Sequence, residues 1–153
     1  MSLSFSTYLK NKWLKAAADS APLGTIINLS EIRIFKGVRP TNADAVCSSA
    51  NLLVSILSGA TGLTFENAAS GIMVKAAAEV WSGVVAAAGT ATWFRLFVKT
   101  EDPYAAVTTT LARIDGNVGE GTEANIDLYL ADTALVATGS PTLTIDVFQI
   151  TLP

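Results

Sequence analysis

Two long segments, residues 89–98 and 142–153, constrain the fold of this chain more than any other feature of its sequence. Both are rich in β-branched and aromatic residues, and neither is interrupted by an internal glycine or proline. Such segments are typical of buried β-strands. Both alternating faces of 89–98 are largely apolar, which predicts a central strand that is covered on each side. We therefore expect a mainly β protein.

Shorter strand-like segments, separated by turn residues, fill most of the remaining chain. Turn signals recur about every eight to twelve residues, as they do in sandwiches and jelly rolls. Residues 115–117 (DGN) form a tight-turn signal, and the glycine-rich residues 116–121 are expected at a flexible hairpin tip. The predicted fold is an antiparallel β-sandwich or jelly-roll-like domain, with further strands at 30–36, 52–57, 72–75, 80–87, 106–114, 124–130 and 135–138.

The closing segment changes its alternation part of the way along. Its apolar residues occupy odd positions up to Val147 and even positions from Phe148 onward. Because side chains alternate between the two faces of a strand, this shift predicts either a β-bulge at Val147 and Phe148 or burial on both faces.

The first twenty residues predict the one helix of the chain. Large apolar residues recur at spacings of three and four from Phe5 to Trp13, whereas Lys10 and Lys15 fall on the opposite side. Ser4 or Ser6 is expected to cap the start of the helix.

Pro22 and Gly24 are expected to end this helix. The chain then divides into an N-terminal helix at 1–22 and a single β-sandwich domain at 23–153. The helix has two interpretations: a lid over one open end of the β domain, or an arm that docks on a neighbouring subunit.

Composition excludes several kinds of chemistry. Histidine is absent and Cys47 is the only cysteine, so zinc sites built from His and Cys, histidine-based triads and disulfides within the chain are excluded. Close pairs of acidic residues lie in or beside predicted turns and match no calcium-loop or glycosidase spacing. We therefore expect no catalytic residues, no cofactor and no metal site, and a protein that is not an enzyme.

Charge is distributed unevenly along the chain. Residues 1–39 have a balance of +4, residues 40–99 a balance of zero and residues 100–153 a balance of −7, within a formal net charge of −3. Two faces of opposite sign would suit contacts between subunits, although folding can also disperse such charges. The sequence has no basic stripe for nucleic acid and no apolar segment long enough to span a membrane, so neither partner is expected.

Two buried features have alternative interpretations. Arg95, between aromatic residues on the expected central strand, needs an acidic partner or a ring to stack on. The tryptophans Trp13, Trp81 and Trp93 fit core packing better than a sugar-stacking platform, whereas Tyr104, after a turn proline, is the aromatic most expected to be exposed.

Several segments, taken in order, resemble small structural proteins encoded among the virion genes of tailed bacteriophages. They span nearly the whole chain: residues 3–11 (LSFSTYLKN), 32–37 (IRIFKG), 89–95 (GTATWFR), 114–116 (IDG), 125–128 (NIDL) and 145–153 (IDVFQITLP).

The resemblance implies a virion protein that is assembled in the host cytoplasm. Such a protein is expected to decorate or cement the capsid shell through contacts with the major capsid protein, as a homo-oligomer such as a trimer. The alternative is a neck, tail, collar or baseplate protein that binds a receptor or glycan. No catalytic or ligand residues carry over. The candidate interface residues are Phe5, Tyr8, Lys10, Lys12, Trp13, Lys15, Arg39 and Tyr104.

Overall fold

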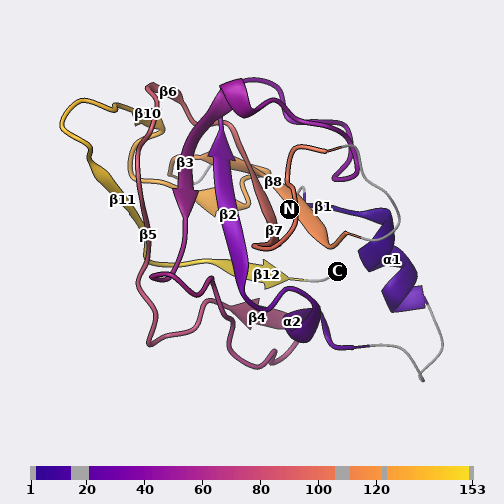
Figure 1. Cartoon of the computed structure of the whole chain (residues 1–153). Coiled ribbons are helices and arrows are strands. Elements are labelled where there is room, and N and C mark those ends of the chain that lie inside the picture. The colour runs from indigo at the N-terminus through magenta and orange to yellow at the C-terminus, as the bar shows by residue number, and fades with distance from the viewer. Residues whose placement is uncertain (1–2, 15–20, 106–110, 122–123, 152–153) are drawn as a thin grey trace.

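The computed structural model describes residues 3–14, 21–105, 111–121 and 124–151 (Figure 1). Its largest sheet has six strands. Five of them follow the order β1-β8-β7-β2-β3, each antiparallel to its neighbours, and the sixth, β9, pairs with β8 in parallel. These strands are β1 (Ser4–Phe5), β2 (Ser30–Phe35), β3 (Leu52–Ile56), β7 (Trp93–Val98), β8 (Arg113–Gly119) and β9 (Leu128–Tyr129).

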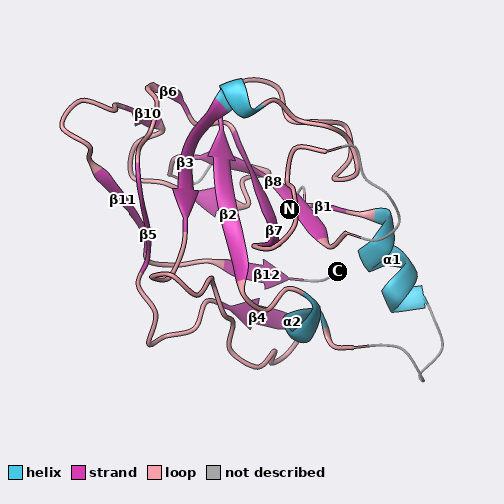
Figure 2. Ribbon diagram, in the orientation of Figure 1, coloured by secondary structure: helices cyan, strands magenta, loops and turns pink. Residues whose placement is uncertain are grey.

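Among the described residues, three more antiparallel strand pairs lie beside this sheet (Figure 2). They are β4 (Ile72–Val74) with β12 (Gln149–Thr151), β5 (Trp81–Val84) with β11 (Thr142–Ile145), and β6 (Gly89–Thr90) with β10 (Ala134–Leu135). The helical elements are α1 (Thr7–Leu14), α2 (Leu23–Ile26) and a 3-10 turn at Ser49–Asn51. The predicted class, a mainly β antiparallel protein with a helix near its N-terminus, is confirmed.

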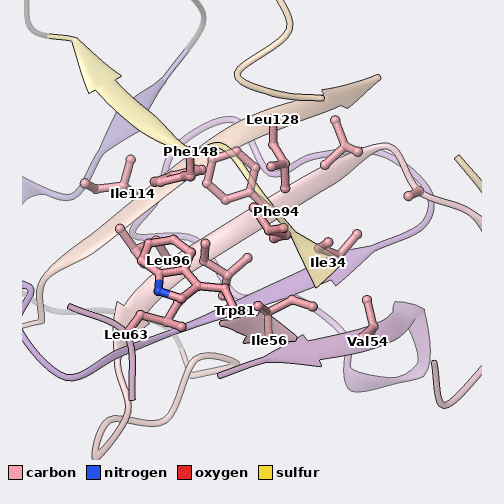
Figure 3. Close-up of a cluster of buried hydrophobic side chains, with 14 of the residues drawn as sticks. Ile34, Val54, Ile56, Leu63, Trp81, Phe94, Leu96, Ile114, Leu128 and Phe148 are labelled. Carbon is pink, nitrogen blue, oxygen red and sulfur yellow. The ribbon is translucent and has the colours of Figure 1, made fainter. Parts of the chain in front are cut away.

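The hydrophobic core lies on one face of the central sheet, in a sandwich-like arrangement. Strand register places Ile34 opposite Phe94, and Leu96 opposite Ile114, so these side chains share that face. Two aromatic residues from outside the sheet close the core, because the ring centroid of Phe148 lies 5.6 Å from that of Phe94 and 5.7 Å from that of Trp81 (Figure 3).

β5 approaches β3 so closely that one position on it must be glycine. A Cβ atom at Gly83 would lie 1.9 Å from the backbone oxygen of Ser55. We expect Gly83→Ala to lower the free energy of unfolding by about 3 kcal/mol or more, because two backbones would have to separate. Chemical denaturation measures the loss. Val84→Ala, at a position 54% exposed on the same strand, is the control and should change stability by no more than about 0.5 kcal/mol.

Glu79 fixes the loop that leads into β5. Its carboxylate accepts hydrogen bonds from the Trp81 indole N–H (2.6 Å), the Thr64 backbone N–H (3.0 Å) and the Thr64 hydroxyl (2.8 Å). Burial tends to raise the pKa of Glu79, but these hydrogen bonds and the charge of Lys75 outweigh it and lower the pKa below its usual 4.5. The ionised carboxylate is therefore the form that the folded state favours.

Glu79→Gln is expected to cost about 1–3 kcal/mol of stability at neutral pH, because a charged acceptor is lost from three donors. Since the pKa of Glu79 is lowered on folding, its contribution is present above pH 4.5 and is lost as pH falls through the folded-state pKa. Denaturation of wild type and variant across this range should show the two stabilities converging in acid. A difference that does not depend on pH would contradict this role. Asp146→Asn, at an exposed carboxylate, is the control.

The predicted N-terminal helix and its cap at Ser6 are confirmed, since the Ser6 hydroxyl accepts a hydrogen bond from the backbone N–H of Leu9 over 3.4 Å. Phe5 is in a strand, β1, and the helix begins at Thr7, where the Asp44 carboxylate accepts hydrogen bonds from the backbone N–H (3.0 Å) and the hydroxyl of Thr7. Pro22 directly precedes α2, which contains Gly24, so Gly24 lies inside a second helix. Pro22 is the residue before the first helical position of α2, and its carbonyl oxygen accepts the first hydrogen bonds of that helix, from the backbone N–H groups of Thr25 and Ile26. The predicted helical residues 15–20 lie outside the described part of the chain.

The predicted turn at residues 115–117 and the hairpin tip at 116–121 are wrong, because residues 113–119 form β8 without interruption. Gly116 is needed for packing and does not form a turn. A Cβ atom there would lie 2.5 Å from Cε1 of Phe94 on the neighbouring strand. Of the predicted strand at 106–114, residues 106–110 lie outside the description, and β8 begins only at Arg113.

Both long segments are divided in the structure. Residues 89–98 form β6 and β7, because the backbone N–H of Thr92 donates to Phe35 and that of Ala91 donates to Thr133, on two different elements. The closing segment likewise divides at the predicted shift near Val147 and Phe148. There the chain leaves β5 and begins to pair with β4, so the shift marks a change of partner and not a bulge within one strand.

Candidate functional site

A layer of charged side chains lies on the second face of the central sheet, opposite the core. Strand register places Arg33 opposite Arg95, and Arg95 opposite Asp115. The next row of this face contains Glu31, Phe97 and Arg113 in register. This polar layer is covered by loop residues 38–51 and 99–105, as its hydrogen bonds show.

Arg95 and Asp115 form the centre of the polar layer. The guanidinium donates to both carboxylate oxygens, over 2.8 Å from Nε and 2.7 Å from Nη2, and both side chains are fully buried. Burial raises the pKa of Asp115, and the charge of Arg95 opposes this rise. Arg95 Nη1 also donates to the Pro103 (2.8 Å) and Ala45 (3.2 Å) carbonyl oxygens, which fastens both loops to the sheet.

The prediction that Arg95 needs an acidic partner or a ring is confirmed on both counts, since its guanidinium also lies 5.7 Å from the Trp93 ring. The sequence does not predict Asp115 as this partner, because residues 115–117 (DGN) favour a turn in isolation. The signal that could have identified Asp115 is the alternation of residues along β8, the strand that pairs with β7.

The other two arginines of the layer are also held by covering residues. Arg33 pairs with Glu31 over 2.6 Å and lies between the rings of Phe97 (5.2 Å) and Tyr104 (5.0 Å). Arg113 is fully buried and donates from Nη1 to the Ala105 carbonyl oxygen over 3.0 Å. Because loops close over these groups, the polar layer fixes loop positions and gives no open catalytic cleft.

Two unsatisfied polar atoms lie at the edge of the polar layer. Arg113 Nε and Glu101 Oε2 are buried without a hydrogen-bond partner. Burial lowers the pKa of Arg113, and the charge of Arg95 lowers it further. Burial raises the pKa of Glu101, against the opposing effect of Arg113. Cys47 is half-buried beside Arg95, and burial raises the pKa of its thiol, which makes the thiolate less available.

Five of the eight candidate interface residues lie together around α1. The rings of Phe5 and Trp13 are 4.8 Å apart at an interplanar angle of 66°, and the Lys12 ammonium lies 5.6 Å from the centroid of the Tyr8 ring. Lys10 is exposed on the same helix. The helix is anchored in its own chain by Leu9, which is fully buried in the core.

The remaining three candidates do not form part of that cluster. Arg39 lies on the loop after β2, where its charge acts on Asp115. Tyr104 is half-buried over Arg33, so it belongs to the cover of the polar layer and is less exposed than expected. Lys15 lies outside the described residues.

A groove that the sequence did not reveal lies on another side of the molecule, between β11 and the segment that contains β9 and β10. Its volume is about 510 Å³. Tyr129, Val136 and Val147, which line the groove, are 51%, 60% and 77% exposed. Asp132 and Asp146 also line it, and the lining described by the structure includes no lysine or arginine. The sequence features that point toward this groove are the shift in alternation after β11 and the excess of acidic residues in the C-terminal third of the chain.

A sugar-stacking platform built on Trp81 and Trp93 is excluded, because these side chains are 0% and 1% exposed. Core packing is therefore the confirmed interpretation for both. Trp13 differs from the prediction, since it is 38% exposed at the end of α1.

No protein-family model matches the chain, and no curated protein or solved structure matches it. Within the described ranges, no helix is long and apolar enough to cross a membrane. The same ranges contain no group of three or more His, Cys, Asp or Glu residues arranged to hold a metal ion.

Proposed function

We propose that this chain is a non-enzymatic structural protein of a bacteriophage virion, which decorates or cements the capsid shell through contacts with the major capsid protein. The observation that carries the proposal is a pair of apolar surfaces on the folded chain, one at the end of α1 and one in the acidic groove. The resemblance of segments throughout the sequence to small virion proteins supplies the class.

The exposed side chains are of the kind that subunit contacts bury. Leu14 is 86% exposed, and Val136 and Val147 are more than half exposed. Large apolar side chains grouped on a surface mark interaction sites more often than singly scattered ones do. The polar layer also favours binding, because it holds the loops 38–51 and 99–105 in fixed positions. A surface that is ordered before binding loses less conformational entropy when a partner docks.

Cryo-electron microscopy of the particle encoded alongside this chain tests the proposal. We expect copies of a small β domain to repeat over the capsid lattice, with density that fits the central sheet and α1. A particle from which the gene is deleted is the control and should lack this density. If the protein is absent from wild-type particles, the virion proposal is wrong.

A receptor- or glycan-binding role at the neck, tail, collar or baseplate is the second candidate, and one observation favours it. Tyr129 is half-exposed in a groove that also contains the carboxylates of Asp132 and Asp146. An exposed ring beside polar acceptors can stack on a sugar and hydrogen-bond its hydroxyl groups. Loss of glycan or cell binding in Tyr129→Ala, with an unchanged melting temperature, would support this role. Tyr104 and Trp81 do not provide this test, because both are needed for packing.

A further inference from the structure

We propose that the acidic groove between β10 and β11 binds the end of α1 from a second copy of this chain, so that copies join head to tail. This inference rests on the proposed function, since it names one contact by which the protein would assemble. Three observations support it: apolar side chains exposed on both surfaces, charges of opposite sign, and the positions of the two surfaces on the molecule.

The end of α1 presents an apolar projection on a fixed support. Leu14 is 86% exposed and Trp13 is 38% exposed, yet the helix cannot swing freely, because Leu9 is fully buried and Thr7 is bound to Asp44. A rigid helix with one protruding leucine loses little conformational entropy on docking.

The groove is large enough to receive that projection. Its volume of about 510 Å³ is in the range of cavities that enclose a drug-sized molecule, and so it can hold one or two large side chains. Tyr129, Val136 and Val147 would contact the incoming leucine. An anchor side chain that enters a concave apolar site is the usual arrangement of an interface hot spot.

Charge favours the same pairing. Residues 7–14 include Lys10 and Lys12 and no acidic residue. The groove has Asp132 and Asp146 in its lining. Opposite charges around an apolar centre orient two partners and speed their encounter, and like charges disfavour the pairing of two grooves or two helices. The occupant is therefore the helix of another copy and not its groove.

The two surfaces lie on opposite sides of the molecule. In Figure 1, α1 is at the right edge, whereas β10 and β11 are at the left edge. A chain whose helix is anchored by its own core cannot place α1 in its own groove, so the contact joins different copies. Such a contact is heterologous, and it closes into a ring if the rotation between copies allows.

Two charge-introducing variants test the contact from its two sides. Leu14→Asp alters only the projection, and Val147→Asp alters only the groove; both residues are more than three-quarters exposed, so melting temperatures should not change. Sedimentation velocity of the full chain should show wild type assembled at tens of micromolar. Each variant alone should need at least about tenfold higher concentration to assemble, as expected when a hot-spot anchor is lost.

Mixing the two variants gives the decisive result. Leu14→Asp keeps an intact groove and Val147→Asp keeps an intact helix, so an equimolar mixture should form a dimer of one copy of each and no larger species. A mixture that remains monomeric would overturn the inference. So would a Leu14→Asp variant that assembles like wild type while Val147→Asp does not, because the groove would then bind something other than α1, such as an extended strand.

Val38→Asp is the matched control. Val38 is 92% exposed on the loop after β2, outside both surfaces, so this variant should assemble like wild type. A wild-type chain that is monomeric at every concentration would overturn the inference and leave the virion proposal intact, since binding to the major capsid protein is tested separately on particles. Absence from particles, with head-to-tail assembly in solution, would reject the virion proposal alone.

Discussion

A chain that ends at Val147 is expected to show no cooperative thermal unfolding transition. The truncation removes Phe148, which is 3% exposed, and Ile150, which is 1% exposed and belongs to β12. The ring centroid of Phe148 lies 5.6 Å from that of Phe94, 5.7 Å from that of Trp81 and 6.3 Å from that of Phe65, so Phe148 is part of the aromatic core. Without it, the core on that face of the sheet is open.

The magnitude of this loss decides the outcome. Removing a buried phenylalanine costs about 3–5 kcal/mol and removing a buried isoleucine about 2–5 kcal/mol. Together these losses are comparable to the entire stability of an ordinary domain, which is about 5–15 kcal/mol. β4 would also lose its strand partner, and the backbone N–H of Lys75 would lose the Phe148 carbonyl oxygen that it now binds.

Circular dichroism and calorimetry of the truncated chain measure the effect. Two point variants keep the test informative if the truncated chain is insoluble: Phe148→Ala should lose about 3–5 kcal/mol, and Gln149→Ala, at the next residue, whose side chain is exposed, should change little. A truncated chain that melts cooperatively near the wild-type temperature would show that the closing strand is dispensable.

Asp115→Ala is the second large effect and is expected to lower the free energy of unfolding by about 3–5 kcal/mol. The substitution leaves the fully buried guanidinium of Arg95 without its carboxylate partner. It also weakens the attachment of loops 38–51 and 99–105, because Arg95 donates to carbonyl oxygens in both. Urea denaturation gives the loss of stability, and hydrogen exchange should show faster opening of these two loops.

A comparison with the other ion pair of the layer separates burial from charge. Arg33 is 21% and Glu31 7% exposed, against 0% for both members of the central pair, and Gln keeps an acceptor oxygen for Arg33, so Glu31→Gln should cost less than Asp115→Ala, about 1–3 kcal/mol. The double variant Arg95→Met with Asp115→Leu should lose less than the sum of its single changes, by about 0.5–3 kcal/mol. Equal losses for Asp115→Ala and Glu31→Gln would contradict the central place of the buried pair.

The groove and the polar layer could not be predicted from sequence, for one shared reason. Each brings together segments that are far apart in the chain, and their register depends on the turns between them. Residues 115–117 show how this fails: DGN favours a turn in isolation, yet Gly116 lies in the middle of β8 because the Phe94 ring needs the space where a Cβ would be. Tertiary packing overrode local turn preference there.

The sequence by itself determined the class of fold and the location of most core strands. Alternation and β-branched composition are local properties, so β2, β3, β4 and β7 form close to where the pattern predicts them. The sequence also predicted that Arg95 needs an acidic or aromatic partner, because a buried guanidinium is costly when it is unpaired. Only the tertiary structure decided that the partner is Asp115, that the long segments divide between sheets, and that exposed apolar residues gather on two opposite sides. Those outcomes depend on contacts between distant residues, whose free energies no local pattern encodes.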